Sequence, residues 1–237
     1  MPSYYPIMLD VRNRPAIVIG GDRLAAEKAA ALSASGALVT VMSPVFCEEL
    51  LDLERSSRVK LRYKAYEHGD LAGAFVVIAA TNDPQVIEEV WSETQERGQL
   101  VNIVDVPARC NFIMPSILRR GQLTIAVSTE GASPSLAKRI RQRLEGLFPP
   151  AYDTYLRLAA IARTYIREHG LGYTQRDEFF ADFFTSDILD FLIENDEVEA
   201  VASTVRLLRN YSIETSAATI IASLKEADNK NGTYHNV

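Results

Sequence analysis

Residues 15–42 read PAIVIGGDRLAAEKAAALSASGALVTVM. A short apolar, β-branched run opens this stretch and ends at Gly20 and Gly21. The alanine-rich segment at 24–35 is typical of a helix. Residues 37–42 form a second continuous apolar run, as found in strands of a parallel sheet that is covered on both faces. Strand, glycine turn, helix and strand in this order predict the first βαβ unit of an α/β domain.

The alternation continues along the chain. Apolar runs at 59–63, 74–79 and 100–104 are separated by helical segments, of which residues 84–97 are the clearest. Strands that alternate with helices predict a doubly wound, Rossmann-like parallel sheet, because right-handed crossovers leave few other topologies.

The pattern changes after Pro107. Runs at 112–114 and 123–127 are expected to be strands of a small antiparallel or mixed unit, because no long helix separates them. Ser133 is predicted to cap a helix that begins at Pro134. The chain beyond residue 149 is predicted to be helical, with one apolar face at Tyr155, Leu158, Ala159 and Ala162 and another at Val198, Val201, Val205 and Leu208. We therefore predict a Rossmann domain at 1–111, a central segment at 112–148, a helical domain at 149–228 and a flexible tail at 229–237.

Composition excludes several classes of protein. The 237 residues are 47% hydrophobic and 24% charged, which is typical of a folded globular chain. No run is long enough to span a bilayer and the first residues do not form an export signal, so we expect a cytoplasmic location and no membrane partner. The net charge of −6 disfavours nucleic acid as a partner. Cys47 and Cys110 match no metal-ligand spacing, and no resident metal site is expected.

The glycine turn matches the dinucleotide fingerprint G-x-G-x-x-G/A at two positions of three. Gly20 and Ala25 fit the first and third positions, but Asp22 places a carboxylate where a pyrophosphate should bind. Its side chain could instead turn outward or cap the N–H of Leu24 or Ala25. The loop alone leaves a nucleotide site and a purely structural turn both open. No acidic residue ends the second strand, so NAD cannot be distinguished from NADP there.

Five further segments carry a resemblance to a known family. They are ATNDP at 80–84, VNIVD at 101–105, NFIMPS at 111–116, AVSTEGASP at 126–134 and LAKRIR at 136–141. Together with the glycine turn, they resemble the bifunctional precorrin-2 dehydrogenase and sirohydrochlorin ferrochelatase family. The resemblance covers roughly residues 5 to 147.

This resemblance implies an enzyme of siroheme biosynthesis. It implies a homodimer associated through the central segment, oxidation of precorrin-2 to sirohydrochlorin with NAD⁺, and insertion of Fe²⁺ as a second substrate. Asp105 matches the family's catalytic aspartate, a general base, although an aspartate before Pro107 can also simply form a turn. The residues predicted to bind the cofactor are Gly20, Gly21, Asp22, Arg23, Leu24, Ser43, Pro44, Thr81 and Asn102.

Two departures leave other functions open. Asp22 replaces a glycine, and Ile87 stands where the family commonly has an asparagine. Both residues lie in the predicted nucleotide-binding domain. A chelatase without dehydrogenase activity and a non-catalytic tetrapyrrole or nucleotide sensor therefore remain alternatives.

Positive charge is concentrated in one part of this acidic chain. Between residues 109 and 143, seven Lys and Arg residues are accompanied only by Glu130. Tetrapyrroles of this pathway carry eight carboxylates, which guanidinium groups bind well. Salt bridges across a dimer interface and simple solvent exposure are the alternatives. The residues predicted to bind substrate are Arg109, Arg119, Arg120, Ser128, Lys138 and Arg139.

Overall fold

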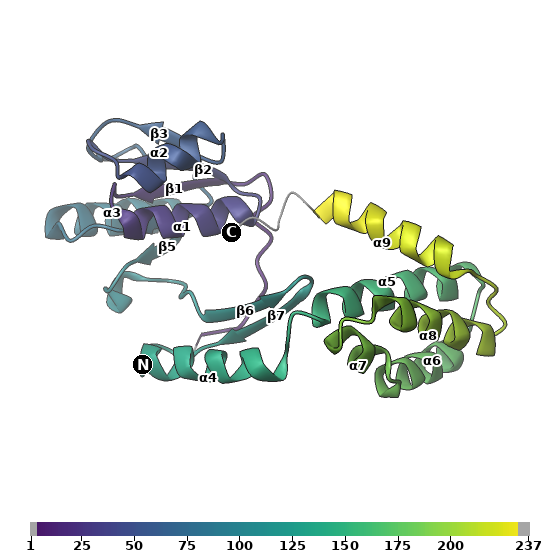
Figure 1. Ribbon diagram of the computed structural model, residues 1–237. Coiled ribbons are helices and arrows are strands. Elements are labelled where there is room, and N and C mark those ends of the chain that lie inside the picture. The colour runs from purple at the N-terminus through teal and green to yellow at the C-terminus, as the bar shows by residue number, and fades with distance from the viewer. Residues whose placement is uncertain (1–3, 232–237) are drawn as a thin grey trace. The chain divides into compact units, whose positions relative to one another are not determined.

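The structure is a computed structural model that describes residues 4–231, with side chains described as far as Glu226. The chain divides between Met114 and Pro115 into two compact units, which are considered separately below (Figure 1). Among the described residues, no helix has both the length and the apolar character needed to cross a bilayer.

The N-terminal unit contains a five-stranded parallel sheet with the strand order β3-β2-β1-β4-β5. Its strands are β1 (Pro15–Ile19), β2 (Leu38–Met42), β3 (Lys60–Arg62), β4 (Val76–Ala79) and β5 (Leu100–Ile103). Its helices are α1 (Arg23–Ala34), α2 (Glu48–Arg55), α3 (Pro84–Arg97) and the short 3-10 helix η1 (Pro107–Arg109). The predicted doubly wound α/β fold is confirmed, and each predicted strand of this sheet is present to within two residues at either end.

Both faces of this sheet are covered, which explains its continuous apolar strands. Ala16 and Val18 of β1 belong to a buried cluster on one face, whereas Ile17 and Ile19 belong to a second cluster on the other. Strand order reverses between β1 and β4, so the connections that leave these two strands lead to opposite sides of the sheet at a topological switch point. Ligands of open α/β sheets bind in the crevice beyond such a point.

The C-terminal unit begins with an antiparallel hairpin. It consists of β6 (Ser116–Arg120) and β7 (Leu123–Val127), followed by α4 (Pro134–Leu147). Ser133 caps α4 by accepting a hydrogen bond from Leu136 N, and Pro134 is the first helical residue, as predicted.

The predicted strand at 112–114 is wrong. The Asn111 side chain accepts a hydrogen bond from Val101 N and donates one to Gln99 O, and the Asn102 amide donates to Phe112 O. One backbone bond, from Asn111 N to Val101 O, also joins the segment to β5, but no ladder of backbone bonds continues from it. Pro115 has no N–H to donate, so the hairpin starts at Ser116.

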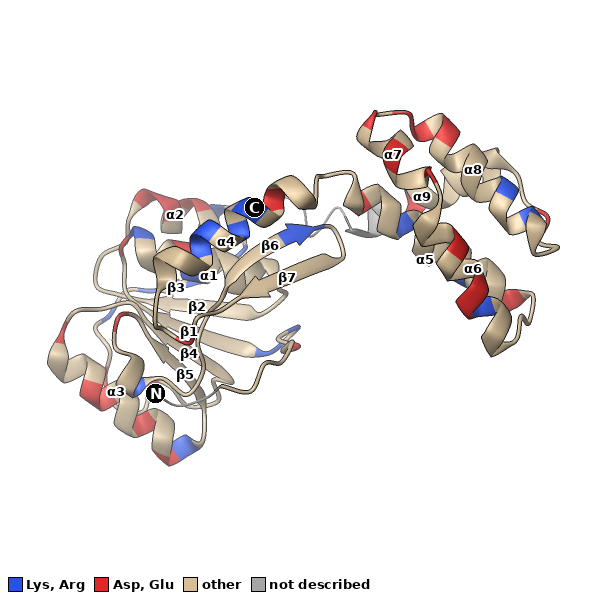
Figure 2. Cartoon of the chain, turned by 90° about the horizontal axis from the view of Figure 1, so that it is seen from below, with Lys and Arg blue, Asp and Glu red and all other residues tan. Residues whose placement is uncertain are grey.

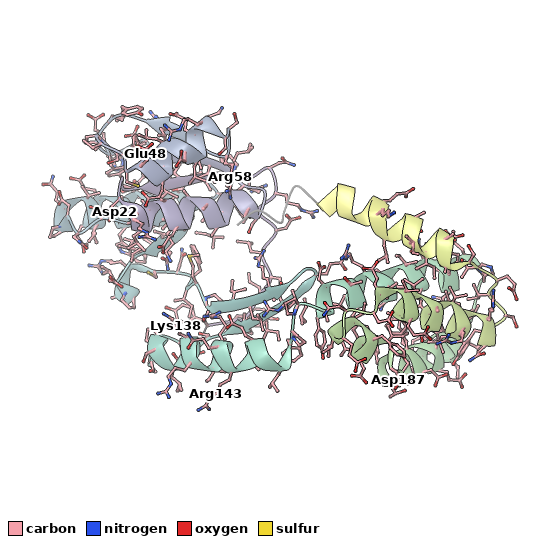
Figure 3. The ribbon with its side chains drawn as sticks, in the orientation of Figure 1. Asp22, Glu48, Arg58, Lys138, Arg143 and Asp187 are labelled. Carbon is pink, nitrogen blue, oxygen red and sulfur yellow. The ribbon has the colours of Figure 1, made fainter. Side chains whose placement is uncertain are left out.

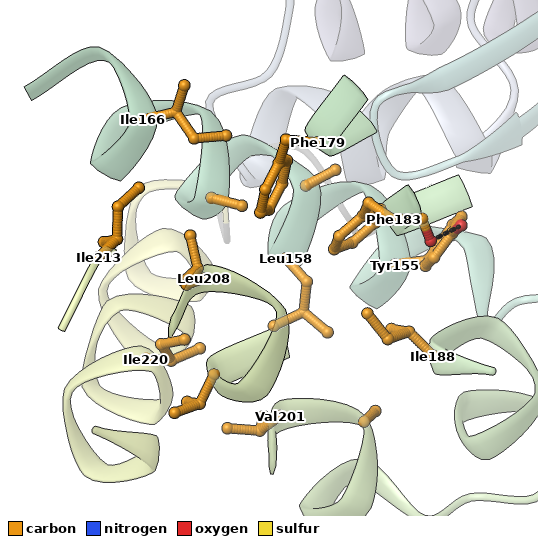
Figure 4. Close-up of a cluster of buried hydrophobic side chains, with 14 of the residues drawn as sticks. Tyr155, Leu158, Ile166, Phe179, Phe183, Ile188, Val201, Leu208, Ile213 and Ile220 are labelled. Carbon is orange, nitrogen blue, oxygen red and sulfur yellow. Dashed lines mark hydrogen bonds between the residues drawn. The ribbon is translucent and has the colours of Figure 1, made fainter. Parts of the chain in front are cut away.

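The rest of this unit is helical, as predicted. It comprises α5 (Tyr152–Glu168), α6 (Tyr173–Thr185), α7 (Ile188–Ile193), α8 (Glu197–Asn210) and α9 (Ala217–Asn231). Its core is rich in aromatic and aliphatic side chains that include Tyr155, Leu158, Phe179 and Phe183 (Figure 4).

Two details of the helical prediction are wrong. Val198 is 75% exposed, because it lies in the first turn of α8 on the flank of a buried stripe formed by Ala200, Val201, Thr204, Val205 and Leu208. The tail was predicted to start at residue 229, but α9 continues to Asn231. The rest of that tail, 232–237, lies outside the described residues.

Candidate functional site

Three loops meet at the carboxyl edge of the N-terminal sheet. Backbone hydrogen bonds join the end of β1 to those of β2 and β4, from Gly20 N to Met42 O and from Ala80 N to Ile19 O. A further bond from Val104 N to Ala79 O joins the end of β5 to that of β4. The glycine turn, the Thr81 loop and Asp105 therefore follow neighbouring strands at one edge.

The glycines of the turn are required by close packing. Gly20 has a φ of +136°, and a side chain there would collide with the Ala80 carbonyl oxygen. A Cβ on Gly21 would collide with the Val45 carbonyl oxygen and the Ser43 hydroxyl. Between β1 and α1, the loop therefore has no side chain at Gly20 or Gly21. A loop of this kind lets a pyrophosphate approach the N-terminus of a helix.

Asp22 uses its side chain to cap α1. Its Oδ1 accepts a hydrogen bond of 2.9 Å from Ala25 N, one of the two alternatives expected for this residue. Within the described part of the chain, the N–H groups of Arg23 and Leu24 have no partner and remain available to an anion. The loop therefore fits a pyrophosphate through its backbone and opposes it through the Asp22 charge.

Two side chains that sequence reasoning missed flank this loop. Val45 and Tyr63 are both exposed although they are large and apolar, and the Tyr63 ring contacts Phe46 edge-on at 4.8 Å between centroids. They follow β2 and β3, the strands on the side of the sheet where an adenosine binds in this type of fold. The available signal was a large apolar or aromatic residue within three positions of the end of each strand. The neighbouring Ser43 donates its backbone N–H to Arg62 O, and Pro44 follows it in the same turn.

Thr81 and Asn102 support loops in this structure. Thr81 Oγ1 accepts a hydrogen bond of 3.2 Å from Asp83 N, and Asp83 in turn caps α3. The Asn102 amide nitrogen is 3.0 Å from Phe112 O, which it holds against β5. Both residues border the candidate nucleotide site, and each side chain holds a loop of the chain in place.

Asp105 is exposed and has a left-handed backbone with a φ of +61°. It lies in a turn closed by a hydrogen bond from Val106 N to Ile103 O. A left-handed position favours glycine, and an aspartate there costs roughly 1 kcal/mol unless its side chain compensates. Among the described residues, no hydrogen bond or ion pair engages the Asp105 carboxylate. The turn therefore does not use this side chain, which weakens the purely structural explanation for it.

The basic residues predicted to bind substrate fall into two groups. Arg109 forms two hydrogen bonds of 3.0 Å with Glu88, which raise its pKa, and Arg120 Nε donates to Phe148 O at 2.9 Å. Within the described residues, the side chains of Arg119, Lys138 and Arg139 form no hydrogen bond or ion pair. Only this second group has all of its charged nitrogens free for a carboxylate ligand.

Basic residues are numerous on α4 (Figure 2). Lys138 and Arg143 lie on different sides of the helix (Figure 3), as a separation of five residues requires. The Ser128 hydroxyl accepts a hydrogen bond of 3.0 Å from Glu130 N and thereby supports the turn after β7. A single ligand in one orientation could therefore not reach both Lys138 and Arg143.

The hairpin and α4 leave much apolar surface exposed. Between residues 115 and 147, all of which the structure describes, only Leu118 and Ala137 are fully buried. Ile117, Leu136 and Leu147 are exposed large apolar residues. Exposed apolar residues gathered in one segment mark an interaction surface.

Neither cysteine resembles a reactive or metal-binding thiol. Burial raises the pKa of the Cys110 thiol, whose Sγ lies 3.2 Å from both Ile103 N and Ile103 O. The pKa of Cys47 is also raised by burial. Over the part of the chain that the structure describes, no three His, Cys, Asp or Glu side chains gather as a metal site.

Comparison with known proteins gives a consistent result. Residues 7–116 match a family described as putative NAD(P)-binding, and residues 120–147 match one described as sirohaem biosynthesis protein central. The siroheme synthase of Actinobacillus pleuropneumoniae serotype 3 is 34% identical over 203 residues, which are 86% of this chain and 42% of that protein. The siroheme synthase of Nitrosospira multiformis is 37% identical over 217 residues, 90% of this chain and 46% of that protein. This chain thus spans less than half the length of these relatives.

A solved structure is similar along most of the chain. The structure titled SirC, precorrin-2 dehydrogenase, superposes with a TM-score of 0.72 at 26% sequence identity. The match covers 85% of this chain and 98% of that one. The similarity therefore includes elements beyond the nucleotide-binding sheet.

Proposed function

Because the chain belongs to the siroheme synthase and precorrin-2 dehydrogenase family, we propose that it oxidises precorrin-2 to sirohydrochlorin with NAD⁺. The observation that carries this proposal is the free carboxylate of Asp105. It stands at the carboxyl edge of a parallel sheet whose glycine turn suits a dinucleotide.

The reaction removes two hydrogens from the macrocycle, one as a hydride and one as a proton. NAD⁺, when bound, would accept the hydride. The carboxylate of Asp105 would accept the proton, since no group of the described chain competes for it. Gly20, Gly21 and the N–H groups of Arg23 and Leu24 would hold the pyrophosphate, while Asp22 would weaken that binding.

We also infer that two copies of the chain associate through the hairpin and α4. The exposed apolar residues of this segment support that inference, because a second copy would cover them. The side chains of Arg119, Lys138 and Arg139 form no hydrogen bond or ion pair within the described residues. These three cations would therefore bind the substrate carboxylates.

A second candidate activity is insertion of Fe²⁺ into sirohydrochlorin. Asp22 favours it, because a carboxylate in the pyrophosphate loop impairs only the nucleotide-dependent step. Asp105 would then accept protons from the ring nitrogens as the metal enters.

Purified protein mixed with precorrin-2 and NAD⁺ tests the first activity. We expect the sirohydrochlorin absorbance spectrum to appear with one NADH formed per macrocycle. Absence of both signals would refute the dehydrogenase proposal. Sirohydrochlorin and Fe²⁺ without NAD⁺ test the second activity separately.

A further inference from the structure

A groove between α5 and α6 combines positive charge with aromatic surface. It has a volume of about 530 Å³ and lies wholly within the C-terminal unit. Its lining includes three arginines and three aromatic residues: Arg163, Arg167, Arg176, Tyr173, Phe180 and Phe184. None of these residues belongs to the site proposed above.

These three arginines differ from the others of the helical region. Residues 149–231 contain six arginines. Three are paired with carboxylates: Arg157 with Asp153, Arg206 with Glu199 and Arg209 with Glu214. Across the described chain, the three arginines of the groove have no ion pair, although Asp177 also lines it. The arginines of this region without a carboxylate partner are therefore the ones gathered around the groove.

Two of these arginines are held in place by other contacts. The Arg163 guanidinium lies over the Phe180 ring at 4.9 Å from its centroid. Arg176 Nε donates a hydrogen bond of 2.7 Å to Leu171 O, which leaves its terminal nitrogens free. Arginines held by such contacts lose less side-chain entropy when they bind a carboxylate.

The aromatic side chains present flat apolar surface to solvent. Tyr173 is 86% exposed and Phe184 is 53% exposed. The rings of Phe180 and Phe184 are nearly parallel, with an interplanar angle of 28° and centroids 5.7 Å apart. Apolar rings that gather at one exposed place can serve as a binding surface.

The groove is positively charged, whereas the helical region around it is acidic. Residues 149–231 contain eight Lys and Arg residues against fourteen Asp and Glu residues. The groove has three cations and one carboxylate. A positive groove in an acidic region selects a ligand with several negative charges.

We propose that this groove is a second binding site for a planar polycarboxylate macrocycle. The choice of ligand rests on the proposed function, because its substrate and product are both of this class. Arg163, Arg167 and Arg176 bind carboxylates at one edge of the macrocycle, and the rings of Phe180 and Phe184 contact its apolar face. The groove is open to solvent, so the remaining carboxylates stay hydrated.

The probe is uroporphyrin I, an octacarboxylate that is already fully oxidised, titrated into the full chain without NAD⁺ and followed by Soret absorbance. We expect Arg163→Gln/Arg167→Gln to lower the affinity of one site per chain at least tenfold. The matched control is Arg206→Gln/Arg209→Gln, which removes the same charge from α8 and should leave the affinity of that site within twofold. Phe184→Ser should weaken the same site and reduce the Soret shift.

Unchanged uroporphyrin binding in the Arg163→Gln/Arg167→Gln variant would overturn this proposal. Equal losses in that variant and in the α8 control would also overturn it, because the effect would then be one of net charge. Circular dichroism checks that each variant is folded. Precorrin-2 oxidation is measured separately, so a chain that binds porphyrin in the groove but does not oxidise precorrin-2 refutes the proposed function alone.

Discussion

Replacing Asp22 by asparagine should tighten NAD⁺ binding. The Asp22 carboxylate lies at the N-terminus of α1, where its Oδ1 accepts the Ala25 N–H that a phosphate oxygen could otherwise use. Asparagine keeps the size and the capping oxygen of the side chain and removes only its charge. The substitution therefore isolates the electrostatic effect of this residue.

The size of the effect follows from Coulomb's law. A carboxylate about 5 Å from a phosphate costs roughly 1 kcal/mol in water and more in a less polar environment. Asp22 is exposed, so the aqueous value applies, and two phosphates with salt screening give a total of about 1–2 kcal/mol. This corresponds to a roughly 5- to 30-fold lower Kd.

Isothermal titration calorimetry with NAD⁺ at low and high salt measures the change. We expect Asp22→Asn to bind more tightly than wild type, with a difference that shrinks as salt is added. Asp22→Gly should also bind more tightly, with at most a few tenths of a kcal/mol lost from stability. The control is Asp196→Asn, which changes the equivalent cap of α8. Unchanged NAD⁺ affinity in Asp22→Asn would mean that the pyrophosphate does not bind at this loop.

Three further predictions concern the fold and its association. Burial alone would raise the pKa of Glu93, but hydrogen bonds from Tyr66, Gly69 N and Arg97 hold this pKa below its usual value. The stability that the Glu93 carboxylate provides is therefore present above its unfolded-state pKa. It is lost as the pH falls through the folded-state pKa. Chemical denaturation should show Glu93→Gln to be about 2 kcal/mol less stable than wild type at pH 7, with a smaller loss at low pH; equal stability at pH 7 would contradict this. Gly20→Ala should lower the free energy of unfolding by at least about 2 kcal/mol in the same measurement, because the new methyl group would collide with the Ala80 carbonyl oxygen and φ is positive there. A stability equal to that of wild type would contradict the conformation of this turn. Ile117→Asp should shift the molar mass measured by light scattering from dimer toward monomer, and an unaltered dimer would place the interface elsewhere.

The sequence was most informative where local pattern and tertiary structure agree. The strands of the N-terminal sheet are continuous apolar runs because both faces are covered, and their ends were predicted to within two residues. The prediction failed at 112–114, where an apolar run is held by the Asn111 and Asn102 side chains instead of a strand ladder. It failed again at Val198, since burial depends on which helices pack together.

The candidate site was only partly predictable for the same reason. The sequence pattern identified the glycine turn, and the family resemblance identified Asp105. Only the backbone geometry decides between a cap and an outward orientation for Asp22. Val45 and Tyr63 resemble core residues in sequence and are exposed in the structure. The groove arginines could not be distinguished from paired ones, because ion pairing depends on the packing of α5 against its neighbours.

The most direct test of this account compares wild type with Asp105→Asn in the oxidation of precorrin-2 by NAD⁺, with NAD⁺ binding measured on both proteins. Asparagine suits the left-handed backbone of this turn, so the variant should fold and bind NAD⁺ as wild type does. We predict a fall in the rate of sirohydrochlorin formation of at least 100-fold, which is the lower end of the contribution of a general base. A rate within threefold of wild type would contradict the assignment of Asp105 as the group that accepts the proton.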